Sequence, residues 1–184
     1  MPKIEPARPL VKRARRAVAV KRSNAKAATA PSDASAEHQL DGFIAKFSPP
    51  DQKRIRSVRS AMRKRLPTAH EMVYDNYNFF VIGYSPTLRP LDAPVSIAAG
   101  PESISLCFLY GAKLPDPQRV LLGSGTQTRF VRLDSAATLR RPEIAALLDA
   151  AVARAKAPFT ASGRGSLVIR SISAKQRPRR RPEP

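Results

Sequence analysis

Residues 71–85 read EMVYDNYNFFVIGYS and mix strand-forming side chains with amides and an acid. Asn and Asp are poor strand formers, yet Asp75, Asn76 and Asn78 stand among tyrosine and phenylalanine in this run. We interpret the run as a polar-lined elbow at the mouth of a sheet. Aromatic side chains supply apolar area and amides fix orientation, so the elbow is the leading candidate for ligand binding.

The candidate ligand site consists of the elbow and two further polar residues, and its members are Tyr74, Asp75, Asn76, Tyr77, Asn78, Tyr84 and Lys113. An alternative interpretation is a plain turn, in which the Asx side chains bond to nearby backbone and the tyrosines are half-buried sheet residues. A third is an enzyme in which Asp75 acts as a general base, which requires that residue to be buried.

Helical periodicity dominates the sequence before the elbow. Ser35 is a candidate N-cap for a helix whose apolar face is Leu40, Phe43, Ile44 and Phe47. A second helix begins after Ser48, with Pro at its first position, and ends at Pro67. Its apolar face is Ile55, Val58, Met62 and Leu66, and seven cations between Lys53 and Arg65 occupy the rest of the cylinder.

Short apolar or alternating runs of strand length follow the elbow, at residues 79–84, 95–99, 103–110, 126–133 and 166–172. A late helix is predicted over 141–156, with Pro142 at its start and with Ile144, Leu147, Leu148 and Val152 on one face. This order predicts an α+β domain, an antiparallel sheet of about five strands with helices packed on one face.

Basic residues concentrate at the ends of the chain, which carries 33 Lys and Arg against 14 Asp and Glu, a net charge of +19. We expect residues 1–35 to be a disordered basic tail, 36–173 the folded domain and 174–184 a disordered Arg/Pro-rich tail. The tails predict nonspecific contact with nucleic acid or another polyanion. The cations assigned to it are Lys12, Arg13, Arg15, Arg16, Lys21, Arg22, Lys175, Arg177, Arg179, Arg180 and Arg181.

The chain resembles the YdhG-like domain family over residues 37–177. The resemblance rests on the order of elements and on three stretches, VYDNYNFFVIGYSPT (73–87), LCFLYGAKLPDP (106–117) with GSG downstream, and SAKQRPRR (173–180). It implies a frataxin-like sandwich, and some relatives are described as iron chaperones. The sequence departs from that role, because Glu37, Asp41 and Asp51 of the first helices stand against Lys46 and the seven cations of residues 53–65.

Other chemistry finds little support in the sequence. His38, His70 and Cys107 are far apart and fit no metal-ligand spacing, so no metal site and no cofactor are predicted. The Gly-Ser-Gly-Thr run at 123–126, with Arg129 nearby, is an anion nest or, by the simpler interpretation, a turn before a strand. No serine or cysteine lies in a nucleophile motif.

The compartment predicted is the cytoplasm, because the lone Cys107 forms no intramolecular disulfide and no apolar stretch approaches the roughly 20 residues of a membrane span. An Arg- and Ala-rich beginning also fits a mitochondrial transit peptide, which stays an alternative. We expect a noncatalytic binding or adaptor module that holds an unknown small ligand or protein at the elbow, with polyanion affinity in its tails. The alternatives are an iron-binding chaperone and an enzyme of unrecognised type using Asp75.

Overall fold

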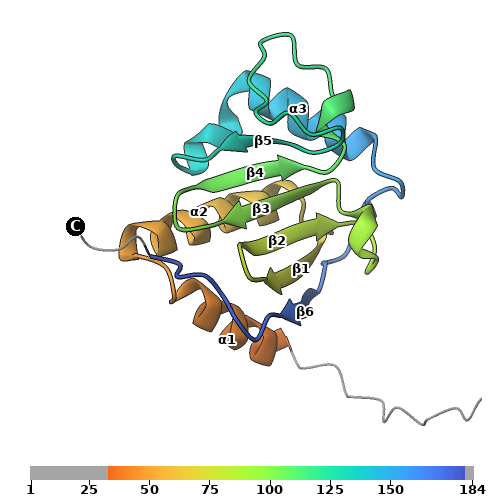
Figure 1. The fold of residues 1–184 in the computed structure, drawn as a ribbon. Helices are drawn as coiled ribbons and strands as arrows, with labels where there is room; N and C mark the ends of the chain where they lie inside the picture. The colour runs from red at the N-terminus through yellow and green to blue at the C-terminus, as the bar shows by residue number, and fades with distance from the viewer. Residues whose placement is uncertain (1–32, 181–184) are drawn as a thin grey trace, which may run out of the picture. The chain divides into compact units, whose positions relative to one another are not determined.

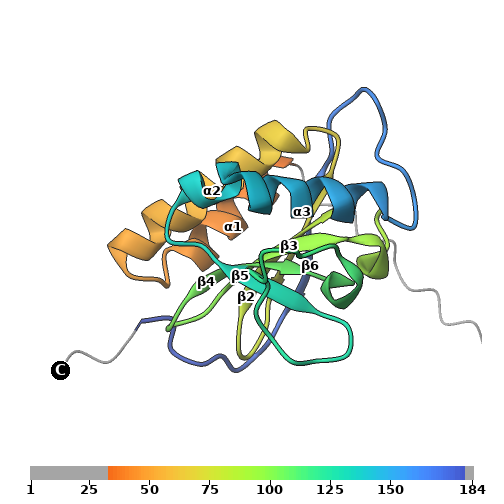
Figure 2. The same cartoon turned by 90° about the horizontal axis from the view of Figure 1, so that it is seen from above.

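The computed structural model describes residues 33–180, in which helices lie on one side of a single sheet (Figures 1 and 2). Within these residues the α-helices are α1 (Asp33–Ile44), α2 (Pro49–Arg65) and α3 (Pro142–Ala153). The strands are β1 (His70–Asp75), β2 (Phe80–Ser85), β3 (Val95–Ala99), β4 (Ile104–Phe108), β5 (Arg129–Arg132) and β6 (Leu167–Ile172). Short 3-10 turns are η1 (Pro90–Asp92), η2 (Gly111–Lys113) and η3 (Ala136–Arg140).

The sheet of the described region has six strands in the order β5-β4-β3-β2-β1-β6 and is mixed. Strands β1 to β5 pair antiparallel with their neighbours in sequence, whereas β6 lies parallel to β1. The α+β class is thus confirmed, but the finer prediction of an antiparallel sheet of about five strands is not confirmed, because the sheet is mixed and has six strands. The path of the chain explains why β6 is parallel to β1. After β5, at one edge of the sheet, the chain crosses over through α3 to the other edge. It therefore enters β6 in the same direction as β5 and β1.

The additional strand is β1, which the elbow interpretation hid. Its register with β2 runs from His70 opposite Ser85 to Asp75 opposite Phe80, so residues 76–79 are the loop of a hairpin. The Asn76 N–H donates to the Phe79 carbonyl across 3.0 Å and closes that loop. The amides therefore serve as turn residues, a role for which Asn is well suited.

The core lies between the helices and one face of the sheet. The predicted faces of the first two helices are all buried, at Leu40, Phe43, Ile44, Phe47, Ile55, Val58, Met62 and Leu66. On α3 the predicted positions Ile144, Leu147 and Leu148 are buried too, and Val152 is partly buried against the same cluster. The sheet adds alternate residues, among them Val73, Phe80, Ile82, Ile97 and Phe108. Burial of a large apolar side chain contributes about 1.5–3 kcal/mol, so this interface is the main source of stability.

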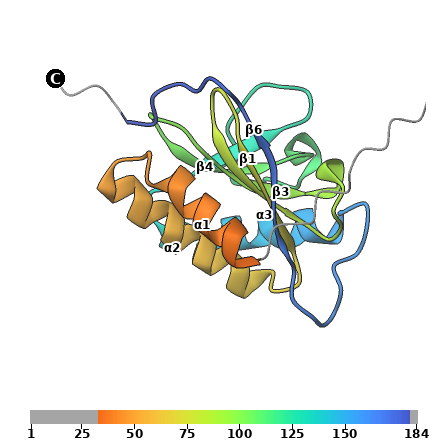
Figure 3. The same ribbon diagram turned by 90° about the horizontal axis from the view of Figure 1, so that it is seen from below.

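The predicted C-terminal tail is only partly a tail. Residues 174–180 run back along the end of the sheet near α1, opposite to the expectation of disorder (Figure 3). The Ser173 N–H donates to the Asp75 carbonyl at 2.9 Å, and the Arg177 N–H donates to the Tyr77 carbonyl at 2.9 Å. The segment is ordered because it extends the pairing of β6 with β1 and brings a buried side chain with it. The predicted tail at residues 1–32 and residues 181–184 lie outside the described residues.

Candidate binding site

The hairpin loop carries the aromatic residues of the elbow at the surface. Tyr77 and Phe79 each keep 50% of their surface exposed, and Asn76 and Asn78 are exposed as well. The Arg177 guanidinium lies 5.7 Å from the centre of the Tyr77 ring, within the range of a cation–π contact. The hairpin loop and residues 174–180 thus form one surface that joins two aromatic rings to a cation.

Strand alternation separates the remaining elbow residues onto opposite faces of the sheet. Tyr74 lies half-buried on the face that the helices leave uncovered, together with its cross-strand neighbour Val81. Asp75, the next residue, points toward the helices and is fully buried. The predicted elbow residues therefore lie close in space, but they do not converge on a single pocket.

Asp75 is the centre of a buried ion cluster. Its Oδ2 lies 2.5 Å from Lys46 Nζ at the end of α1, and its Oδ1 lies 2.9 Å from Arg179 Nη2. The side chains of Asp75 and Arg179 are 1% and 2% exposed. The Gln176 amide joins them, because it accepts from Lys46 Nζ at 2.7 Å and donates to the Asp75 carbonyl at 3.1 Å.

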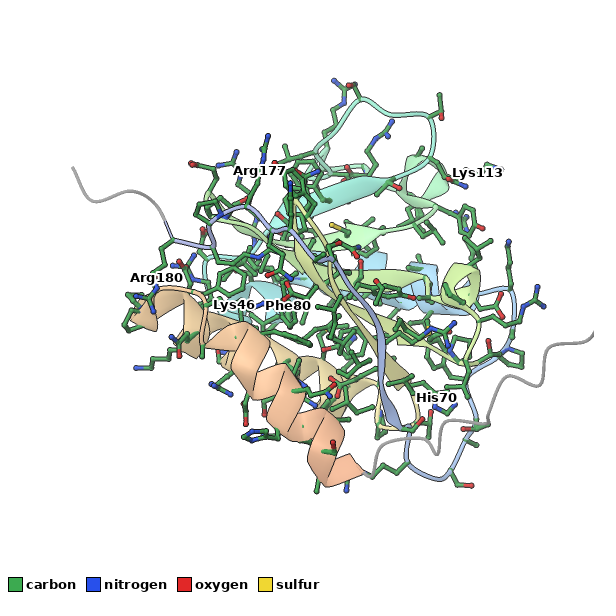
Figure 4. The ribbon with its side chains drawn as sticks, turned by 60° about the horizontal axis from the view of Figure 1, so that its bottom comes forward. Lys46, His70, Phe80, Lys113, Arg177 and Arg180 are labelled. Atoms are coloured by element: carbon green, nitrogen blue, oxygen red, sulfur yellow. The ribbon has the colours of Figure 1, made fainter. Side chains whose placement is uncertain are left out.

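We name the contact of Asp75 with Lys46, Gln176 and Arg179 the C-terminal latch. It corrects the assignment of Arg179 to the polyanion-binding cations, because a buried guanidinium paired with a carboxylate does not reach a phosphate. Lys175, Arg177 and Arg180 remain exposed, and Arg180 donates to the Ala45 carbonyl at 3.4 Å. In Figure 4, Lys46 lies beside Phe80, and Arg180 lies at the α1 side of the domain. The other predicted tail cations, Lys12, Arg13, Arg15, Arg16, Lys21, Arg22 and Arg181, lie outside the described residues.

Tyr84 and Lys113 belong to the opposite end of the sheet. Tyr84 pairs with Val95 at the start of β3, and Lys113 follows the last residues of β4, whereas the hairpin loop joins the end of β1 to the start of β2. Figure 4 shows Lys113 well apart from Lys46 and Arg180. Tyr84 is fully buried, and its hydroxyl has no hydrogen-bond partner among the described residues. Burial, and then the charge of Glu71, raises its pKa well above the usual value.

The charges on α2 are largely compensated. Arg59 Nη2 lies 2.8 Å from Glu37 and 2.6 Å from the buried Glu71, and Arg63 joins Glu37 at 3.0 Å. The hydrogen bond from Arg59, opposed by partial burial, lowers the pKa of Glu37. Five of the seven cations of this helix have an acidic partner, namely Arg54, Arg56, Arg59, Arg63 and Arg65. The helix is thus less of a free cationic face than its sequence indicates.

The uncovered face of the sheet is the larger candidate surface, and the sequence interpretation missed it. Its floor is a shallow hollow of about 430 Å³ that includes Tyr74, Val81, Ala98 and Cys107, and no charged residue lines it. The cross-strand row Tyr74, Val81, Ala98, Ser105 ends at the exposed Arg132 on edge strand β5. At the other edge, the exposed Arg170 is the extra residue of a β-bulge in β6.

Among residues 33–180, none places a carboxylate on this face, because the acids of β1 alternate onto the helix side. Glu71 points toward Arg59 of α2, and Asp75 points toward Lys46 in the connection between α1 and α2. On the side of the sheet away from the α-helices, Met72, Gly83 and Ser105 are themselves buried. The more accessible strand positions on that side include Tyr74, Val81, Ser96, Ala98, Cys107, Phe130 and Arg132. We name this surface, with Tyr77, Phe79 and Arg177 at its hairpin border, the open face. Strand β1, HEMVYD, shows no alternation of polar and apolar residues, so its two faces become clear only from its pairing with β2.

The residue types suited to metal or nucleophilic chemistry are dispersed. Residues 33–180 contain no group of three or more His, Cys, Asp or Glu side chains placed to hold a metal ion. The His70 ring shares a hydrogen bond with the Ser166 hydroxyl at 2.8 Å. Cys107 is partly buried on the open face, and burial raises the pKa of its thiol to about 11. In the predicted anion nest, Arg129 donates to the carbonyls of Gly125 and Thr128, so its guanidinium already has backbone partners.

Comparison with family models, with curated proteins and with solved structures gave no match to this chain. No helix of the described region combines the length and the apolar composition that crossing a membrane requires.

Proposed function

We propose that this protein is a noncatalytic binding module that holds single-stranded nucleic acid on its open face, with basic segments that add nonspecific affinity for phosphates. One observation carries the proposal: the open face is free of carboxylates, has exposed aromatic rings at one border and has cations at its edges. Proteins that bind single strands without sequence preference combine the same two features, aromatic side chains that stack on bases and a positive groove that follows the backbone.

The aromatic border has the chemistry that stacking needs. Tyr77 and Phe79 are both half-exposed, and a Cβ at Gly100 would lie 3.1 Å from the Phe79 ring, so glycine at that position gives the ring its space. Arg177 approaches Tyr77, and a guanidinium beside a ring supports both stacking and phosphate contact. The floor of small residues between Tyr74 and Cys107 leaves room for a base above the sheet.

The cationic edges supply the phosphate contacts. Arg132, Arg170 and Arg177 are exposed, and none of them forms an ion pair with an acidic residue of the described region. A strand crossing the face from β5 to β6 would pass from one arginine to the others. The basic residues of the chain termini, including those outside the described residues, would add a term that depends on salt and not on sequence.

The two alternative hypotheses, an enzyme using Asp75 and an iron-binding chaperone, have weaker support. An enzyme using Asp75 would need its carboxylate open to a substrate, whereas Lys46 and Arg179 hold both oxygens. An iron chaperone would need free carboxylates, whereas Glu37, Asp41 and Asp51 each have an arginine partner. We retain the YdhG-like family and its frataxin-like sandwich as a proposal, supported by the helical layer on one sheet face. We also propose the cytoplasm as the compartment, because Cys107 has no second cysteine to pair with.

The test is fluorescence polarisation of the full chain with a labelled oligothymidine and with a duplex of the same length, across a salt series. The affinity should fall with a slope of about 0.7 per phosphate neutralised on the single strand. Replacement of Tyr77 and Phe79 by alanine should weaken single-strand binding by about 5-fold or more, since stacking contributes about 1–3 kcal/mol per base. The slope should stay unchanged, because no cation is removed.

Matched controls separate the open face from the basic ends. Leu88→Ala removes an apolar side chain that is 51% exposed and lies outside the open face, so it should leave binding unchanged. A second variant replaces six terminal cations by glutamine, at Lys12, Arg13, Arg15, Arg16, Lys21 and Arg22. It should lower the salt slope, and replacing Tyr77 and Phe79 in it should still weaken single-strand binding. If the aromatic variant binds as the parent does while the glutamine variant loses all binding, the terminal cations are the site and the proposal for the open face is wrong.

A further inference from the structure

A second hollow lies at the opposite end of the sheet from the hairpin, between the end of β4, the η2 turn and the end of α3. Its volume is about 240 Å³. Phe108, Leu114 and Ala151 provide apolar lining, and Phe108 is fully buried. The half-buried Tyr110 forms part of the wall. This is a small concave site with an apolar floor, the usual setting for a small-molecule ligand.

The rim of this hollow is positive. Its charged lining residues are Lys113, Arg154 and Lys156, all exposed, and none of the described residues that line it is acidic. Arg154 Nη1 donates to the Lys113 carbonyl and so fixes η2 against the end of α3. Lys156 Nζ lies 5.4 Å from the centre of the Tyr110 ring. We name the site formed by these residues with Phe108, Leu114 and Ala151 the basic-rimmed pocket.

Other hollows of the described region differ in their charge. A hollow of about 430 Å³ beside α1 and α2 sets Glu37 and Glu71 against Arg63 and Arg164. A hollow at the start of α2 sets acids against cations as well, with Asp51 and Glu102 as the acids. In those places protein carboxylates already balance the cations, whereas the lining of the basic-rimmed pocket includes no carboxylate from the part of the chain that the structure describes. The charge of its rim is complementary to an anion that comes from outside the protein.

The helix dipole alone explains the position of only one of the three cations at the rim. Arg154 caps the C-terminus of α3, where the helix dipole favours a cation whatever the function. Lys156 lies two residues beyond that cap, and Lys113 comes from a separate segment 41 positions earlier than Arg154. Helix electrostatics does not require these lysines to meet at an apolar hollow.

We propose that the basic-rimmed pocket binds a small organic anion, with an apolar body of one aromatic ring or a short acyl chain on the floor and a carboxylate or phosphate at the rim. The volume equals that of about eight waters at about 30 Å³ each, which suits a body of that size. The ring of Tyr110 offers a face for an aromatic body. This site lies apart from the open face, so its test does not depend on nucleic-acid binding.

The experiment is an NMR titration of the isotope-labelled full chain with benzoate and with phenyl phosphate, which distinguish a carboxylate from a phosphate ligand. Benzyl alcohol keeps the apolar body without the charge, and acetate and inorganic phosphate keep the charge without the body. At least one aromatic anion should give saturable shifts at the amides of Lys113, Leu114 and Arg154. The three partial ligands should bind at least about fivefold more weakly, the ratio that corresponds to about 1 kcal/mol.

Variants tie the binding to the pocket. Lys113→Gln and Lys156→Gln should each weaken the aromatic anion by up to about fivefold, the upper range for an exposed charge pair. Both side chains are exposed, so these variants should fold. Ala151→Leu fills the floor and should abolish binding. Lys53→Gln removes an exposed lysine from α2 and serves as the matched control.

Two results would overturn the proposal. One is benzyl alcohol binding as tightly as benzoate and phenyl phosphate, which would mean that the cations contribute nothing. The other is an equal effect of Lys53→Gln and Lys113→Gln, or shifts confined to amides outside the pocket, which would mean that the anions respond to the general positive charge of the chain.

Discussion

Asp75→Asn should be the most damaging small substitution in the C-terminal latch. Asn has nearly the shape of Asp, so the change removes the charge and leaves the packing. The guanidinium of Arg179 would then stay 2% exposed without a counter-charge, and two of its nitrogens, Nε and Nη1, already lack partners among the described residues. Removal of one partner of a buried ion pair costs about 3–5 kcal/mol. We expect a loss near the top of that range.

Arg179→Met should cost less, because it leaves Asp75 with Lys46 at 2.5 Å and the backbone contacts of the segment intact. It also removes two buried nitrogens without partners, which offsets part of the loss by about 1–3 kcal/mol. The expected net loss is about 1–2 kcal/mol. Arg177→Gln, two residues earlier, is the matched control; it removes only an exposed cation–π contact with Tyr77, so it should stay within about 1 kcal/mol of the parent.

Urea unfolding of the full chain, followed by far-UV circular dichroism, measures all three variants. A separate thermal unfolding experiment should show a melting temperature lowered by about 2–4 °C for each kcal/mol lost, as expected at this chain length. The double variant Asp75→Asn/Arg179→Met should lose less than the sum of the single losses, because neither charge is then left alone. If residues 174–180 detach in a variant, the loss in free energy of unfolding cannot exceed the cost of that detachment. Faster tryptic cleavage after the exposed Lys175 would detect the detached segment. A loss below 0.5 kcal/mol with unchanged cleavage would refute the latch, because the threshold is about the scatter of surface substitutions.

Three further predictions concern single positions. Gly165→Ala should lower the free energy of unfolding by about 3 kcal/mol or more, since the new Cβ would lie 1.8 Å from the Ala69 carbonyl oxygen. Gly42→Ala on α1 places a Cβ with nothing within 4 Å and should raise the free energy of unfolding by about 0.5–1 kcal/mol. Urea unfolding compares the two variants. Tyr84→Phe removes a buried hydroxyl without a partner and should be neutral or stabilising by up to about 1 kcal/mol, so a clear loss of stability would contradict the assignment. Cys107, with a pKa of about 11, should react slowly with iodoacetamide near neutral pH, and its rate should rise tenfold per pH step until about pH 11; fast labelling of the folded chain at pH 8 would contradict its burial.

The helical half of the fold was predictable because its signal is local. Leu40, Phe43 and Ile44 repeat at helical spacing, and that spacing alone brings them to one face. The sequence does not separate strand β1 from residues 76–79, because both belong to one continuous run of polar and aromatic residues. The hairpin becomes visible only when β1 and β2 are paired, a contact between two segments that no single window contains. The parallel pairing of β6 was beyond reach for the same reason, since it depends on where α3 returns the chain.

The sequence offers candidate site residues, but it does not show how they are arranged in space. Composition marked the elbow aromatics and the basic ends, yet it placed Arg179 among free cations. An ion pair spanning 104 residues leaves no trace in composition. A weak signal was present, because Asp75 stands in a strand where alternation puts it with Val73 on the buried face, and a buried carboxylate requires a cation. Lys113 was likewise marked, but its neighbours Arg154 and Lys156 come from a helix end that only the fold brings close.

The latch and the open face depend on the same short segment. Arg179 anchors residues 174–180 to Asp75, and this anchoring holds Arg177 beside Tyr77 at the border of the open face. A basic segment free in solution would offer its charges in every direction, whereas a docked one offers Arg177 at a fixed place next to a ring. Fixing a contact group in advance lowers the ordering cost of binding. The buried ion pair, a weak source of stability in itself, is therefore explained by what it positions: a cation and an aromatic ring on one side of the sheet, with every carboxylate of β1 on the other.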